Sequence, residues 1–122
     1  MVTASHVLTG LVAFLHVYFL VLEMFLWTTP FGMKSFKRTH EQQIATKSLA
    51  QNQGLYNGFL AAGLVWSFVA EGPIAYQLRV FFLGCVVLAG IYGAATAAKQ
   101  ILYVQAFPAA LALAVTLAVR YA

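Results

Sequence analysis

The chain has 122 residues, of which 62% are hydrophobic and only 8% are charged. Soluble domains average about 25% charged residues, so this chain has too few charges to cover the surface of a soluble fold. The net charge of +4 comes from basic residues between apolar runs, which indicates membrane topology and not nucleic-acid binding. The single cysteine, Cys85, excludes an internal disulfide and a CxxC redox or zinc motif.

Four apolar segments are long enough to cross a bilayer, which takes about 20 residues. They are roughly His6–Thr28, Leu49–Ala70, Tyr76–Ala98 and Ile101–Val119. The segments show no period-2 alternation, so they are expected to be helices and not barrel strands. We therefore predict an all-α membrane protein in which residues 1–122 form a single four-transmembrane-helix bundle.

The breaks between the segments are marked by turn and capping residues. Pro30 and Gly32 are expected to end the first span, and Glu71-Gly72-Pro73 predicts a tight turn after the second. In the loop at 29–48, Thr39 and Gln42 have the spacing of a capping box, so the second helix is expected to begin outside the bilayer, near His40.

The distribution of basic residues predicts an orientation in the cell inner (plasma) membrane. The loop at 29–48 carries four of them, and the link before the fourth span carries Lys99. Basic loops stay on the cytoplasmic side, so the loop at 29–48 is expected to be cytoplasmic and both termini outside. Arg79, just beyond the turn that carries Glu71, is read as part of the same topology pattern.

Polar residues of all four segments are expected in the cytoplasmic half of the membrane. At 1.5 Å per residue, most lie about 6–12 Å inside the predicted cytoplasmic ends, and His16 lies about 18 Å inside. They are Glu23, Asn52, Gln53, Tyr56, Asn57, Tyr92 and Gln105, with His16 the deepest. Polar groups are costly against lipid, so we predict that they face inward and form a polar core. Pro108 is expected to kink the fourth helix near Gln105.

Glu23 is the strongest functional signal, because an ionisable residue within a span is a functional hypothesis by default. The alternative is a salt bridge to Lys34, Lys47 or Lys99. His16 either exchanges protons with Glu23 or a ligand, or hydrogen-bonds a neighbouring helix.

The amides of Asn52, Gln53, Asn57 and Gln105 either orient a polar ligand group or bond between helices. Tyr56 and Tyr92 are donors to a developing oxyanion or core aromatics. We predict no metal site and no cofactor, since His16 and Glu23 supply only two ligands and no second histidine lies at a depth suited to haem.

Several segments together resemble a known family: His16–Leu20, Glu23–Gly32, Asn52–Phe59 and Gly90–Ala94. The sequence is similar to small bacterial and fungal four-span membrane proteins catalogued as domain of unknown function number 1304. The resemblance covers nearly the whole chain. It implies the architecture and brings no established activity.

Three functions compete on these residues. The first is a cytoplasm-facing pocket for a small lipophilic molecule, with Glu23 as general acid or base and His16 as proton partner, for isomerisation, hydration or epoxide opening. The second is a proton-coupled transporter, and the third is a structural or assembly subunit whose polar core sets helix register. Membrane lipid is an expected partner, nucleic acid is not, and homo-oligomerisation stays open.

Overall fold

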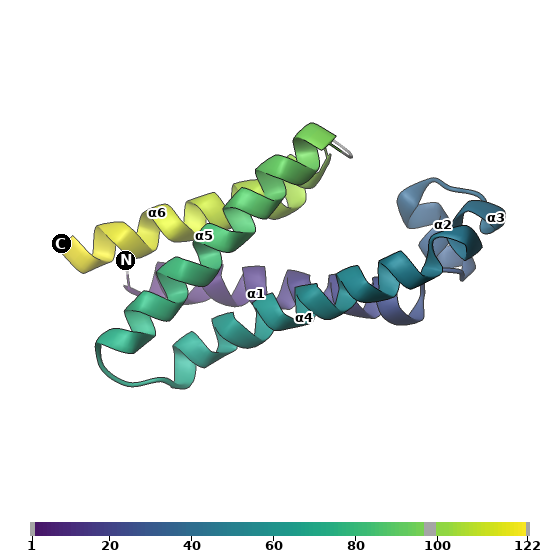
Figure 1. The fold of residues 1–122 in the computed structure, drawn as a ribbon. Helices are drawn as coiled ribbons and strands as arrows, with labels where there is room; N and C mark the ends of the chain where they lie inside the picture. Colours follow the sequence, from purple (N-terminus) through teal and green to yellow (C-terminus); the bar gives the residue numbers. More distant parts are fainter. Residues whose placement is uncertain (1, 97–99, 122) are drawn as a thin grey trace. The chain divides into compact units, whose positions relative to one another are not determined.

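The computed structural model describes residues 2–96 and 100–121, and these residues form helices joined by short turns (Figure 1). In chain order the elements are α1 (Val2–Phe25), α2 (Pro30–Phe36), α3 (His40–Ala45), α4 (Lys47–Val69), α5 (Pro73–Thr96), the π-helical η1 (Leu102–Ala106) and α6 (Phe107–Tyr121). No strand occurs in the described ranges, which confirms the predicted all-α class. Lys99, used in the orientation argument and as a candidate partner of Glu23, lies outside the described residues.

Three of these helices are long and apolar enough to cross a membrane: α1, α5 and the segment Leu102–Val119. They mark the chain as a membrane protein. The segment α4 has 23 residues but does not reach the same hydropathy, because its first half carries Gln51, Asn52, Gln53 and Asn57. The fourth predicted span is therefore not confirmed.

The chain divides into two compact units, each described here by itself. The terminal unit contains residues 1–14 and 60–122, and the central unit contains residues 15–59. Both boundaries between the units fall inside helices: one lies within α1 and the other within α4.

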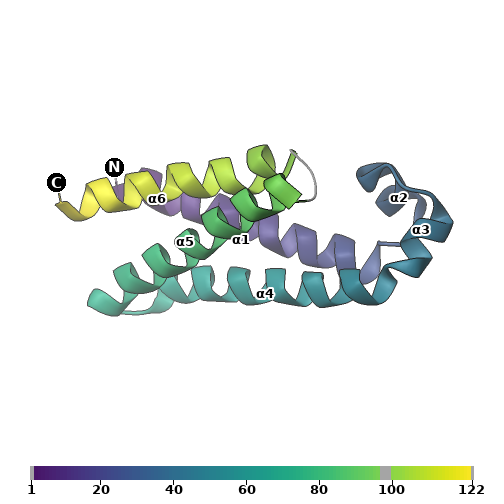
Figure 2. The same ribbon diagram turned by 45° about the horizontal axis from the view of Figure 1, so that its top comes forward.

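The core of the terminal unit consists of apolar side chains from α1, α4, α5 and α6. Its buried members are Val12, Ala13, Leu64, Leu83, Val86, Ala109 and Ala112. Within this unit α5 and α6 form a helical hairpin (Figure 2). Gly90 permits their close approach, since a Cβ there would lie 2.7 Å from both the backbone nitrogen and the Cβ of Ala106. Small residues at such crossings are typical of helix pairs in membranes.

The predicted kink near Gln105 corresponds to a change of helix type. Residues Leu102–Ala106 form a π-helical turn, and the Phe107 amide donates to the Leu102 carbonyl at its end. Pro108 follows directly and has no N–H to donate to the Val104 carbonyl. A local π-turn accommodates that missing bond without ending the helix.

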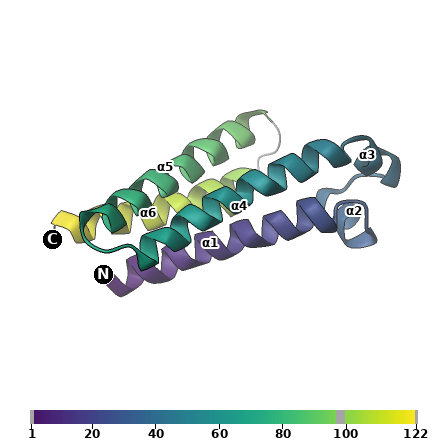
Figure 3. The ribbon, with the colours of Figure 1, turned by 60° about the horizontal axis from the view of Figure 1, so that its bottom comes forward.

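In the central unit the end of α1 runs alongside the beginning of α4 in the opposite direction (Figure 3). Two glycines of α4 make this pairing close. A Cβ on Gly54 would lie 3.2 Å from the Glu23 Cβ, and one on Gly58 would lie 2.6 Å from the Leu20 Cδ1. The GxxxG spacing thus sets these helices near van der Waals contact, as it does in membrane helix pairs.

The connection between these two helices differs from the prediction. The helix α1 ends at Phe25, and Pro30 begins a new helix, α2, because proline is well suited to the first helical position. The Thr29 hydroxyl caps α2 by accepting a hydrogen bond from the Gly32 amide, 3.2 Å away. The capping box of Thr39 and Gln42 is confirmed, but the helix that it begins, α3, ends at Ala45, before α4.

Candidate functional sites

The carboxyl of Glu23 lies in the last two turns of α1 and is partly buried within the central unit. The Asn57 side-chain amide, from α4, donates a short hydrogen bond to Glu23 Oε1. Asn57 is also partly buried. The partner that the structure gives this carboxyl is therefore a neutral amide. Neither Lys34 nor Lys47, both within the described residues, forms an ion pair with Glu23.

A pocket of about 180 Å³ opens beside this carboxyl. It is lined by Glu23, Trp27, Arg38, Thr46, Leu49, Ala50 and Gln53. The walls thus combine one carboxyl, one guanidinium, one amide and one hydroxyl with apolar surface from Trp27, Leu49 and Ala50. This mixture suits a small molecule with an apolar body and one polar group.

The wall of the pocket is held in place by Trp27. Its indole N–H donates to the Thr46 hydroxyl at 3.1 Å, and the Arg38 guanidinium lies 5.9 Å from the centre of its ring. The fully buried Gln43 donates from Nε2 to the Trp27 carbonyl at 3.0 Å. These contacts join α3 and the residues on either side of it to the segment that follows α1, so the pocket is a built feature of the central unit.

The structure brings together some of the predicted site residues. Gln53 is exposed but lines the pocket with Glu23, and the partly buried Asn57 bonds to Glu23. Asn52 and Tyr56 also lie in the central unit, but both side chains are exposed. For these two residues the described structure shows no position beside Glu23.

His16 is completely buried, with its ring edge-on to Phe19 at 5.2 Å between ring centres. Seven residues separate it from Glu23, which is about 10 Å of helix rise. It does not line the pocket beside Glu23. Tyr92, which is exposed, and Gln105, which is partly buried, belong to the terminal unit. The convergence of polar residues from all four segments stays a prediction.

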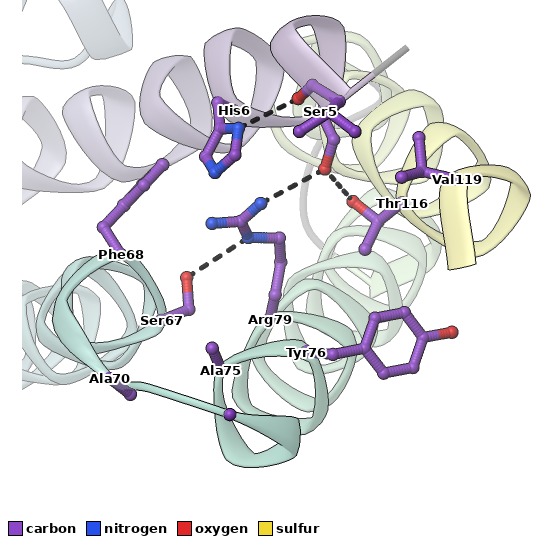
Figure 4. A pocket seen from close by; sticks show the side chains of 12 residues that line it. Ser5, His6, Ser67, Phe68, Ala70, Ala75, Tyr76, Arg79, Thr116 and Val119 are labelled. Carbon is purple, nitrogen blue, oxygen red and sulfur yellow. Dashed lines mark hydrogen bonds between the residues drawn. The ribbon is translucent and has the colours of Figure 1, made fainter.

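A second site, in the terminal unit, is centred on Arg79 (Figure 4). This side chain is only 8% exposed. Its Nε donates to the Ser67 hydroxyl and its Nη1 donates to the Ser5 hydroxyl, both at 3.3 Å. Its guanidinium carbon lies 4.6 Å from the centre of the Phe68 ring.

The hydroxyl of Ser5 connects this site to α6, because it lies 2.7 Å from the Thr116 hydroxyl. A pocket of about 440 Å³ opens at these residues. Its other lining residues are Val2, His6, Phe68, Ala70, Gly72, Ala75, Tyr76 and Val119. Both Ser5 and Thr116 are buried, so the polar part of this pocket is an interior feature.

Reasoning from the sequence missed this site, since an arginine near the end of an apolar segment is also what membrane topology produces. The partners of Arg79 are distant in the chain: Ser67 precedes it by 12 residues and Ser5 by 74. The available signal was that Arg79 falls six residues after Pro73, well inside an apolar helix.

The described ranges contain helices and no strands, and three of the helices are long and apolar enough to cross a membrane. The chain is therefore a helical membrane protein. The chain belongs to the family described as proteins of unknown function DUF1304, whose sequence model matches residues 10–117. It is 28% identical over 109 residues to the uncharacterized protein YpaA of Lactococcus lactis subsp. lactis strain IL1403, which covers 88% of this chain and 91% of that protein. No solved structure matches the chain significantly.

Proposed function

We propose that the protein binds a small lipophilic molecule in the pocket of the central unit and that Glu23 acts on it as a general acid or base. The observation that carries this proposal is the Glu23 carboxyl itself. It lies within a helix of spanning length, lines a pocket and has a neutral amide as its hydrogen-bond partner. A carboxyl that forms no ion pair with the described part of the chain is costly at such a position for structure alone and is suited to proton transfer.

The surrounding residues supply orientation. Asn57 holds the Glu23 carboxyl through its hydrogen bond, and the Gln53 amide faces the same pocket. The Trp27 ring and Leu49 provide the apolar surface for the body of the ligand. One carboxyl with amide donors and the Arg38 guanidinium supports reactions without electron transfer, such as isomerisation, hydration or epoxide opening. In this proposal His16 exchanges a proton with Glu23 only through an intermediate group, because about 10 Å of helix rise separates the two residues.

The proposal includes a membrane arrangement in which α4 is the fourth span of a four-helix bundle. At 1.5 Å per residue its 23 residues reach about 34 Å, enough to cross the hydrocarbon core of a bilayer. Its polar first half runs along α1 through Gly54 and Gly58, so protein covers part of it. With the basic segment at 29–48 on the cytoplasmic side, the pocket opens near the cytoplasm.

The test compares lipophilic extracts of cells and medium after expression of the wild type or Glu23→Gln at equal membrane levels. We expect a chemically altered compound that depends on Glu23. The matched control is Glu41→Gln, which removes an exposed carboxyl of α3 and should leave the extracts as in the wild type.

Two other results would contradict the acid–base proposal. A compound that is unaltered but redistributed between cells and medium indicates a transporter. Identical extracts from wild type and Glu23→Gln, with Glu23→Gln less stable to heat, indicate a structural role for the carboxyl.

A further inference from the structure

We propose that the Arg79 pocket of the terminal unit binds the anionic headgroup of an amphiphile, a carboxylate or phosphate attached to an apolar chain. This inference rests on residues of the terminal unit alone and does not depend on the function proposed for Glu23.

The first argument is the missing counter-charge. Arg79 is 8% exposed, and its hydrogen bonds go to the neutral hydroxyls of Ser5 and Ser67. The only acidic residue in the sequence of the terminal unit is Glu71, whose side chain is exposed. Among the residues that the structure describes, no carboxylate pairs with Arg79. A buried charge without a partner is strongly unfavourable, and a bound anion removes that cost.

The second argument is the donor geometry. A guanidinium has five N–H donors in a planar fork that matches carboxylate and phosphate oxygens. The Ser67 and Ser5 hydroxyls accept hydrogen bonds from Nε and Nη1 of Arg79, which fixes the plane of the guanidinium. The N–H groups of Nη2 are left to donate to another acceptor. Figure 4 shows this end of the guanidinium beside the His6 ring. An anion bound at this end of Arg79 accepts hydrogen bonds from a guanidinium whose orientation is already fixed.

The neighbouring rings complete the site. Phe68 lies 4.6 Å from the Arg79 guanidinium carbon and 5.5 Å from the His6 ring centre. The His6 Nδ1 donates to the Val2 carbonyl at 2.9 Å, because a carbonyl only accepts. The ring is thereby held against α1, in the pocket that Arg79 also lines. Among the described residues no acidic side chain lines this pocket, so an anion meets the Arg79 guanidinium without a competing carboxylate.

The third argument is the position of the pocket and the apolar side chains in its wall. Its lining residues come from the start of α1, the end of α4, the start of α5 and the end of α6. Arg79 is about 9 Å along α5 from Pro73, the depth at which a headgroup meets the hydrocarbon of a bilayer. Val2, Phe68 and Val119 provide apolar surface for the first carbons of a chain. The pocket therefore suits an amphiphile better than a free inorganic ion.

The experiment measures thermal unfolding of the full chain, purified in a neutral detergent, against increasing decanoate, decyl phosphate, decanol or inorganic phosphate. We expect a saturable rise in the unfolding midpoint with decanoate or decyl phosphate, and none with decanol. Saturable stabilisation by inorganic phosphate at a comparable concentration shows that the anion alone suffices and assigns the site to a free anion. Stabilisation only by the decyl compounds assigns it to an amphiphile.

The variants place the effect at Arg79. Arg79→Gln should weaken the binding of the decyl anion at least tenfold, and His6→Gln should weaken it less. Lys34→Gln, which removes an exposed cation of α2, should leave it unchanged. If Arg79→Gln does not fold, Arg79→Lys keeps the charge but loses the planar fork and should still weaken binding several-fold. Equal stabilisation by decanol and decanoate, or equal affinity in wild type and whichever Arg79 variant folds, overturns the proposal.

Discussion

The two sites differ in how the chain builds them. The Glu23 site is formed by residues 23–57, with an amide as the partner of its carboxyl and residues between the helices, such as Arg38 and Thr46, in the pocket wall. The Arg79 site joins hydroxyls from three other helices, with Ser5 and Thr116 separated by 111 residues. In each site an ionisable group has neutral hydrogen-bond partners among the described residues: Asn57 for Glu23, and Ser5 and Ser67 for Arg79. In a membrane protein with only 8% charged residues, these are the two positions at which we propose a bound ligand.

The largest expected effect comes from the hairpin of the terminal unit. Gly90→Val places a side chain against the backbone of Ala106 and should lower the free energy of unfolding by about 3 kcal/mol. Hydrogen exchange should increase in the terminal unit and stay unchanged at residues 15–59. The matched control is Gly84→Val on the same helix, where an added Cβ meets nothing within 4 Å. Equal loss of protection in both units would show that they do not respond separately.

The next effect concerns the central unit. Asn57→Ala removes the donor to Glu23 and should lower the free energy of unfolding by about 2 kcal/mol, since the carboxyl loses its partner while partly buried. Denaturation in detergent, followed by tryptophan fluorescence, measures the loss. Asn52→Ala, at an exposed position of α4, should change it by less than about 0.5 kcal/mol. If the two variants are equally destabilised, the bond to Glu23 is not what distinguishes Asn57.

A smaller and local effect is expected at the capping box. Thr39→Ala removes the side-chain acceptor for the Gln42 amide and should cost about 1 kcal/mol. Limited proteolysis should then cut within residues 37–45 faster than in the wild type. Ser35→Ala is the control, because its hydroxyl bonds only within α2 at an exposed position. Unchanged cleavage of Thr39→Ala would indicate that α3 is held by Gln43 and not by its cap.

The last prediction is a gain in stability. The Thr9 hydroxyl is buried in the terminal unit without a hydrogen-bond partner among the described residues. Thr9→Val removes this unsatisfied group and should raise the unfolding midpoint, by a free energy of about 1 kcal/mol. Thr116→Val, which breaks a bond to Ser5, should lower it. A destabilised Thr9→Val would mean that the hydroxyl has a partner, such as a bound ligand.

Local patterns in the sequence predicted much of this structure. The helical class, the turn at Glu71–Pro73 and the capping box at Thr39 follow from residue type and spacing within a few positions. Glu23 was recognisable because a carboxylate inside an apolar helix is rare in any fold. Its bond to Asn57 was not predicted, because the GxxxG spacing of Gly54 and Gly58 indicates close packing but does not tell that the packed helix is α1.

Other features depend on packing that no local pattern encodes. Asn52 and Tyr56 were assigned to the site by their depth and their shared helical face, but neither tells which side of α4 faces α1. Pro30 was taken as a helix end, although proline also suits a helix start when a residue such as Thr29 precedes it. Arg79 was missed because Ser5, Ser67 and Thr116 meet it only in the folded terminal unit.

The central claim, that Glu23 belongs to a binding pocket for a small lipophilic molecule, is tested most directly by native mass spectrometry. The wild type, Glu23→Gln and Glu41→Gln are extracted gently from the same cells and compared for bound small molecules. The account predicts one adduct of defined mass on the wild type and on Glu41→Gln that is absent from Glu23→Gln. The same adducts on all three folded proteins, or none on the wild type, would contradict it.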